Sequence, residues 1–181
     1  MEQMNDLRAL LMHDLQLLYS VEEQLIDSLP AMAIRANSML LKQAIEEHLE
    51  QTREHRDRLD TIRQMMDVTE ESVTKYAGTL ANLMGEGAMC ISMRGILDEA
   101  RKVMAENLAP QVLDAAIVAA SQKVEHHEIA CYGTARTYAE QLGLSDVADL
   151  LQQTLDEEYE ADSRLTELAT SFINQQAEAK A

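Results

Sequence analysis

Apolar residues recur at helical spacing over almost the whole chain, and this periodicity restricts the possible folds more than any other feature. Residues that favour helices, such as Leu, Ala, Met, Glu and Gln, are abundant, whereas the 181 residues include only two prolines, six glycines and no tryptophan. We therefore predict an all-α protein whose single domain is large enough to bury a substantial core.

Helix-ending and helix-starting residues divide this pattern into five long helices. Asn37-Ser38 is suited to an N-cap, Pro110 to a first helical turn and Gly143 to a helix C-terminus. The predicted ranges are about 6–32, 38–67, 110–142 and 145–173 for the bundle helices and about 88–107 for a crossover helix. The polar tail at 175–181 is expected to fray.

The lengths of the connections predict how these helices are arranged. Short joints near residues 37 and 143 make two antiparallel hairpins, and a long crossover joins one hairpin to the other. This connectivity is that of a ferritin-like four-helix bundle, here formed by residues 1–174 with the crossover helix lying across its outside.

Acidic residues interrupt the apolar stripes of three predicted helices. Glu22 and Glu128 each occupy a position of the apolar stripe of their helix. Glu158 and Asp162 occupy two such positions, one turn apart, on a third helix. Glu125 lies one turn before Glu128, more laterally but within reach of the same point. A buried carboxylate is costly unless it is paired, and several that converge are typical of a metal site.

The second helix contributes imidazoles to the same level. His48 and His55 fall on its buried stripe, and Gln51 flanks that stripe. Carboxylates and imidazoles from four helices are the ligands of dinuclear iron or manganese bundles, so we expect two divalent ions of either metal. The alternative is that each inward acid is a structural group neutralised by its own salt bridge.

Charge and composition exclude several other classes of function. The formal net charge of −17 disfavours binding to nucleic acid or to an anionic membrane surface. No stretch approaches the roughly 20 apolar residues of a membrane span. The acidic N-terminal residues lack the pattern of a signal peptide, so we expect a cytoplasmic protein with Cys90 and Cys131 reduced.

Four segments of the chain resemble the YciF/YciE family of stress proteins. They are LYSVEEQL at 18–25, HLEQTREH at 48–55, QKVEHHEIACYGT at 122–134 and LLQQTLDEE at 150–158. The third segment is the most specific, and the resemblance extends over nearly the whole chain.

The resemblance implies a ferritin-like, generally dimeric bacterial stress protein with a dinuclear metal site like that of rubrerythrin. Glu22, Glu125, Glu128 and Glu158 match the acidic positions of the family, with Asp162 close by. Gln51 stands where the family can have glutamate, which implies weaker binding of a second metal that His55 compensates in part.

Two functions are therefore expected from the sequence. In the first, the metals oxidise Fe(II) or reduce peroxide, and the partners are small oxidants, metal ions and a second copy of the chain. In the second, the protein is a non-enzymatic, dimeric structural or protective bundle with a weak or vestigial metal site.

Overall fold

A computed structural model describes residues 6–66 and 89–179 of the chain. Every regular element in these residues is helical, in agreement with the predicted all-α fold. The elements are α1 (Leu7–Arg35), α2 (Met39–Met65), α4 (Ile91–Ala105), α5 (Pro110–Gln141), α6 (Ser145–Leu168), η1 (Ala169–Ile173) and α7 (Asn174–Glu178).

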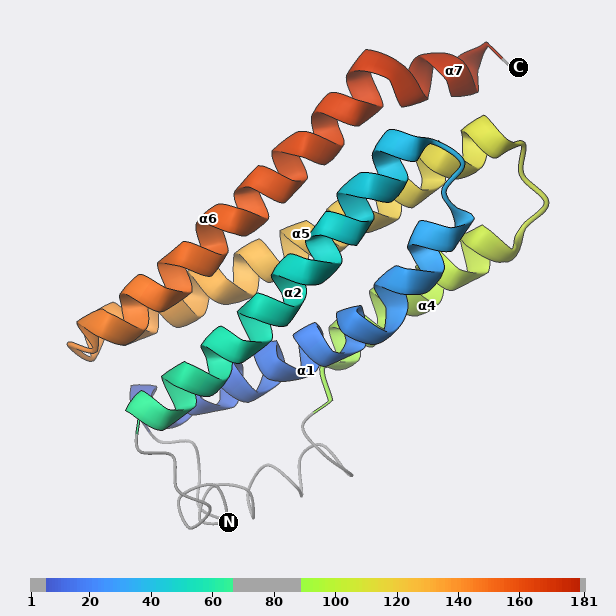
Figure 1. The fold of residues 1–181 in the computed structure, drawn as a ribbon. Helices are drawn as coiled ribbons and strands as arrows, with labels where there is room; N and C mark the ends of the chain where they lie inside the picture. The colour runs from blue at the N-terminus through green and yellow to red at the C-terminus, as the bar shows by residue number, and fades with distance from the viewer. Residues whose placement is uncertain (1–5, 67–88, 180–181) are drawn as a thin grey trace.

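The long helices form the predicted ferritin-like bundle of two antiparallel hairpins (Figure 1). Helices α1 and α2 pack together, as do α5 and α6, and the hairpins meet through α1 against α5 and α2 against α6. Helix α4 packs on the outer side of α5 and α1. Among the described residues, no helix combines the length and the apolar content that crossing a membrane requires.

The turns between paired helices are fixed by specific capping groups. Gly143 has φ of 72° and directly follows the C-cap of α5, where the Leu144 N–H donates to the Ala139 carbonyl at 2.9 Å. At the other turn, the buried carboxylate of Asp114 accepts hydrogen bonds from the backbone N–H groups of Asn37 at 2.7 Å and Ser38 at 2.9 Å. Ser38 is the N-cap of α2, as predicted.

Two predicted boundaries differ from the structure. Helix α1 continues past residue 32 to Arg35 although it contains Pro30, which is exposed and lacks the N–H of a regular helical residue. The tail is also more ordered than predicted, because residues up to Glu178 are helical and the buried side chain of Ile173 anchors this end in the core. Residues 67 and 88, at the edges of two predicted helices, lie outside the described residues.

The apolar core is divided into two clusters along the bundle axis. One cluster lies toward the α1–α2 turn and includes Leu25, Leu41 and Ile117, together with the buried face of α4. The other lies toward the α5–α6 turn and includes Leu11, Leu59 and Leu151. Between the two clusters lies a layer of buried carboxylates and histidines.

Candidate metal centre

Four helices each bring buried polar side chains to the middle of the bundle. The main groups are Glu22 from α1, His48 and His55 from α2, Glu125 and Glu128 from α5, and Glu158 from α6. All are buried, and Glu22, Glu128 and Glu158 have no exposed surface at all. Helical periodicity therefore places these groups at a common level, as the sequence predicts.

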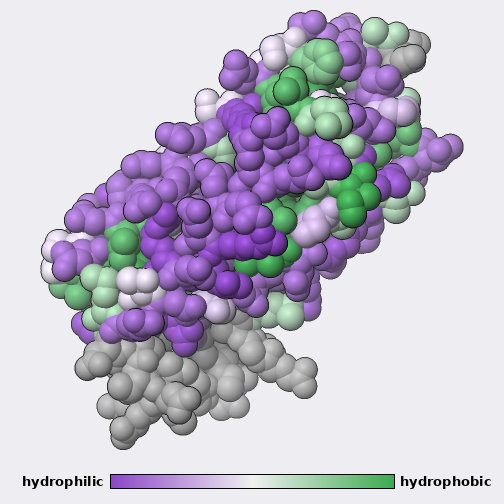
Figure 2. Space-filling view, viewed as in Figure 1, coloured by the Kyte–Doolittle hydropathy of each residue, from purple (hydrophilic) through white to green (hydrophobic). Residues whose placement is uncertain are grey.

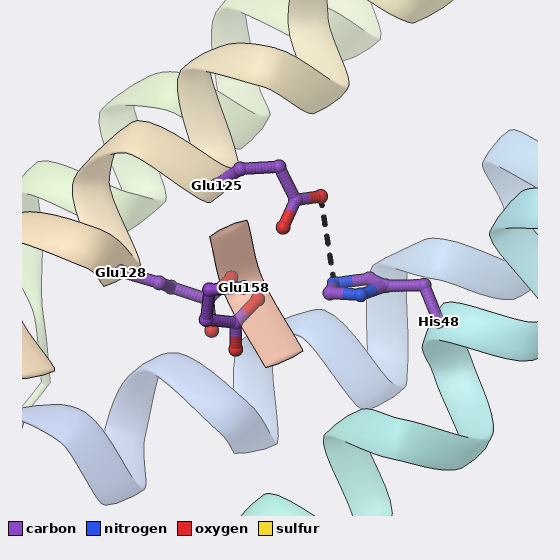
Figure 3. Close-up of side chains that lie close together, drawn as sticks. All are labelled: His48, Glu125, Glu128 and Glu158. Atoms are coloured by element: carbon purple, nitrogen blue, oxygen red, sulfur yellow. Dashed lines mark ion pairs between the residues drawn. The ribbon is translucent and has the colours of Figure 1, made fainter. Parts of the chain in front are cut away.

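The first group of potential ligands comprises His48, Glu125, Glu128 and Glu158. One ligand atom from each residue lies within 4.8 Å of all the others. Figure 3 shows the His48 ring of α2 facing the Glu125 carboxylate of α5, with Glu158 beside Glu128. The ion pair drawn there joins His48 Nε2 to Glu125 Oε1 over 3.6 Å.

The second group comprises Glu22, His55 and Glu158, whose ligand atoms meet the same 4.8 Å limit. Glu158 is therefore common to both groups. Its Oε1 lies 2.9 Å from His55 Nδ1, an ion-pair contact whose angle is not that of a hydrogen bond. The Tyr132 hydroxyl, which is fully buried, donates a hydrogen bond to Glu22 Oε1.

The far side of the His55 ring is held by an outer network. His55 Nε2 donates to Glu157 Oε2 at 2.8 Å, and Arg58 Nη1 donates to the same oxygen at 2.9 Å. Arg58 also donates to the Thr154 hydroxyl. The Glu157 carboxylate therefore fixes the orientation of the His55 ring and leaves Nδ1 directed at Glu158. Histidine ligands of metals are commonly held in this way.

The buried carboxylates differ in protonation. Burial raises the pKa of Glu22 to about 8, although the nearby His55 charge opposes this effect. Burial, together with the charge of Glu158, holds the pKa values of Glu125 and Glu128 well above their usual range. Burial would also raise the pKa of Glu158, but interactions with His55 and His48 lower it. Glu158 is therefore the acid that stays ionised most readily.

The two histidines shift in opposite directions. Burial lowers the pKa of His48. Burial acts on His55 in the same sense, but the carboxylates of Glu158, Glu22 and Glu157 outweigh it and raise the pKa of His55 to about 9. The raised pKa of His55 and the lowered pKa of Glu158 thus favour an imidazolium–carboxylate pair within the site.

Many polar atoms of the site accept or donate no hydrogen bond among the described residues, although some of them make ion-pair contacts. They include both side-chain oxygens of Glu128 and of Glu158, one oxygen each of Glu22 and Glu125, and both ring nitrogens of His48. In the same part of the chain, no lysine or arginine forms an ion pair with any of these four glutamates. Histidines are the only ion-pair partners of these glutamates in the described residues, His55 for Glu158 and His48 for Glu125, and the oxygen and nitrogen donors fit a divalent cation.

Two predicted ligands lie at the edge of the site. Asp162 is half-buried, joins neither group, and accepts a hydrogen bond from Gln122 Nε2 at 3.1 Å, with His126 Nε2 3.5 Å away. Asp162, one turn after Glu158 on α6, thus points toward Gln122 and His126 of α5 and not toward the two ligand groups. Gln51 is half-buried and lines a cavity together with His48 and Glu125.

The sequence did not identify the residues that support the ligands. Neither Tyr132 nor Glu157 is singled out by the spacing of buried positions within its own helix. A signal for Glu157 exists in retrospect: Arg58 follows His55 at the i+3 position, so both face one side of α2 and one acceptor on α6 serves both.

A separate group of thiols and an imidazole lies outside the carboxylate layer. His127 Nε2 is 3.5 Å from Cys90 Sγ and 3.7 Å from Cys131 Sγ, and both cysteines are free. Burial alone would raise the pKa of the Cys90 thiol, but hydrogen bonds with His127, Ser92 and the Met93 backbone have the larger effect and lower it to about 7.

The connectivity of the bundle and its buried layer of carboxylates and histidines define a ferritin-like protein. The sequence pattern described as "Domain of unknown function (DUF892)" matches residues 6–178. The chain therefore belongs to the DUF892 family.

Relatives of known sequence and structure agree with this assignment. Protein YciF of Escherichia coli strain K12 is 39% identical over 178 residues, which cover 98% of this chain and 99% of the relative. The crystal structure of the E. coli stress protein YciF superposes with a TM-score of 0.80 at 37% identity, covering 94% of this chain and 99% of that one. YcfI of Rhodopseudomonas palustris, provisionally described as a structural protein, superposes with a TM-score of 0.78 at 33% identity, covering 91% and 96% of the two chains.

Proposed function

We propose that the protein binds two divalent metal ions, iron or manganese, in the carboxylate layer and acts in a bacterial stress response. The observation that carries this proposal is the set of buried oxygen and nitrogen atoms without hydrogen-bond partners, contributed by four helices and close enough together to hold an ion. Leaving such groups unpaired costs roughly 1–3 kcal/mol each, so their accumulation at one level calls for a ligand.

Charge balance supports two ions rather than one. Glu22, Glu125, Glu128 and Glu158, when ionised, carry the charge that neutralises two divalent cations. Glu158 belongs to both groups and so is positioned to contact both ions. The neutral amide of Gln51 does not disturb this balance, because four buried carboxylates are present without it.

Two bound ions of iron or manganese would supply one-electron chemistry toward O2, peroxide or Fe(II). The chain's own residues exclude bulk water from this chemistry, because apolar clusters close the bundle on either side of the layer. Glu157 holds the Nε2 proton of His55, so Nδ1 is the atom available as a ligand once its proton is lost. The Tyr132 hydroxyl orients Glu22.

Metal analysis after purification without chelators tests the proposal directly. We expect two ions per chain in the native protein and none in the double variant Glu22→Ala/Glu158→Ala. The matched control is Glu23→Ala/Glu167→Ala, which removes exposed acids from the same two helices and should retain both ions. A native protein without metal, or equal loss in both variants, would contradict the proposal.

A second candidate is a non-enzymatic, protective bundle with a weak metal site. The description of YcfI as a structural protein favours this candidate. Oxygen and peroxide consumption by the metal-loaded protein separates the two, since only the first candidate predicts turnover that disappears in the double variant. Under the second, the double variant changes stability alone.

We further propose that the protein is a homodimer. Apolar side chains are exposed near the α1–α2 turn, where Ile34 is 79% and Met39 is 76% exposed, and hydrophobic patches lie toward this end in Figure 2. Burial of such a patch against a second copy would stabilise a dimer. Sedimentation should give twice the chain mass, and Ile34→Glu/Met39→Glu should give the monomer.

A further inference from the structure

A cavity of about 130 Å³ opens beside the carboxylate layer, inside the half of the bundle nearer the α1–α2 turn. Its walls are mainly apolar and come from all four bundle helices, with Leu29, Ile45, Val124 and Leu165 among them. The outer end lies between α2 and α6, where Ala161 lines it beside more exposed polar residues. A path therefore leads from the surface to the polar layer.

The inner end of the cavity has polar atoms that no protein group satisfies. Ser121 is 5% exposed, and its hydroxyl has no hydrogen-bond partner among the described residues. Glu125 Oε2 and both ring nitrogens of His48 share this condition, and all three residues line the cavity. These groups can both donate to and accept from a ligand hydroxyl.

The size and chemistry of the cavity restrict what it can hold. A dry protein cavity of about 150 Å³ accommodates one benzene molecule, so this cavity matches a single small ring or a short branched chain. At the inner end an anion would meet the carboxyl group of Glu125, since the cationic Arg164 lies among the exposed residues of the outer end, and a cation would leave water for mainly apolar walls. We propose that the cavity binds one small uncharged molecule of phenol size, with its apolar body against the walls and its hydroxyl toward Ser121 and Glu125.

This binding does not itself require a metal. A molecule so placed lies next to His48 and Glu125, two residues of the proposed metal centre. Oxidation of the molecule would therefore depend on that centre, whereas its affinity for the cavity does not. The two proposals can therefore fail separately.

Titration of phenol into the purified full-length protein, followed by calorimetry, tests the cavity. We expect one site per chain with a dissociation constant of about 1 mM or lower, which is within the affinity available to so small a ligand. Toluene, which lacks the hydroxyl, should bind about 2–10-fold more weakly. The Ser121→Ala variant should lose most of this preference for phenol while its core stays filled.

Blocking the cavity provides the second measurement. Ala161→Phe should weaken phenol binding at least about tenfold, because the ring occupies the space of the ligand. Ala130→Phe places the same side chain on the exposed face of α5 and should bind phenol like the native protein. Circular dichroism checks that each variant is folded. If Ala161→Phe does not fold, Ser121→Ala still tests the proposal.

The outcomes discriminate clearly between the proposals. Absence of phenol binding at about 10 mM, well above the expected dissociation constant, would overturn the cavity assignment. The cavity assignment would also be overturned if phenol and toluene bound with equal affinity and Ser121→Ala changed neither. A folded Ala161→Phe variant that bound phenol with native affinity would overturn it too. Absence of metal from a native protein that binds phenol would overturn only the metal centre.

Discussion

Raising the pH from 6.5 to 8 should destabilise the metal-free protein. Over this interval the unfolded chain has already lost the Glu22 proton and loses the remaining half of the His55 proton. The folded protein holds more of both protons, because the pKa of Glu22 is raised to about 8 and that of His55 to about 9. The raised pKa values of Glu125 and Glu128 act in the same direction. Where the folded state binds more protons than the unfolded state, the free energy of unfolding falls with increasing pH.

The expected size of the effect follows from the number of protons. One to two extra protons in the folded state correspond to roughly 1–3 kcal/mol per pH unit. Over this interval the melting temperature should fall by about 5–15 °C for a domain of this size. The Cys90 thiol, whose pKa is lowered to about 7, and His127, whose pKa is raised to about 10, act in opposite directions and largely cancel.

Bound metal should reverse the sign of this dependence. Carboxylate and imidazole ligands bind a cation in their deprotonated forms, so binding releases protons and becomes tighter as the pH rises. The stabilisation that excess Mn²⁺ provides over a chelator should therefore grow between pH 6.5 and 8.

Thermal unfolding followed by circular dichroism measures both slopes, with a chelator in one series and Mn²⁺ in the other. Glu22→Gln should flatten the metal-free slope, because it removes one titrating group while keeping an acceptor for Tyr132. Glu23→Gln, an exposed neighbour, should leave the slope unchanged. A metal-free protein whose stability is constant or rises over this interval would refute the reasoning.

Three further changes separate the site from the rest of the fold. Glu128→Gln should stabilise the metal-free protein in chemical unfolding, because a buried amide avoids the desolvation cost that raises the pKa of the Glu128 carboxyl, yet it should reduce metal content. Asp114→Asn should destabilise the protein by about 1–3 kcal/mol without changing metal content, since one backbone N–H of Asn37 or Ser38 loses its acceptor. The ultraviolet absorbance of the Cys90 thiolate should appear with a midpoint near pH 7 rather than at the ordinary 9.0, and Cys90→Ser should abolish it.

Local sequence signals were sufficient to predict the bundle. Periodicity, Ser38, Pro110 and Gly143 define where helices begin and end, and short joints leave few ways to pair them. The end of α1 shows the limit of such signals. The predicted helix passes through Pro30 and ends near residue 32, but burial of Met32 and Ala33 favours its continuation to Arg35, and this packing depends on helices that are distant in sequence.

The site was predictable where burial follows from one helix alone. Glu22, Glu128 and Glu158 replace apolar residues in otherwise regular ladders, so their inward direction can be read from spacing. Asp162 has the same spacing, but its direction depends on Gln122 and His126 of the neighbouring helix. The contact of Tyr132 with Glu22 joins residues 110 positions apart in the chain, which no local pattern encodes.

The two apolar clusters explain how one layer can be both costly to the fold and suited to binding. They exclude water from the carboxylates, and this exclusion raises the pKa of Glu22 and leaves oxygens of Glu128 and Glu158 without partners. The same exclusion strengthens the attraction of any cation that enters, because a low dielectric screens charges less. Substitutions that relieve the buried acids should therefore stabilise the empty bundle and weaken its binding, since both effects arise from the same desolvation.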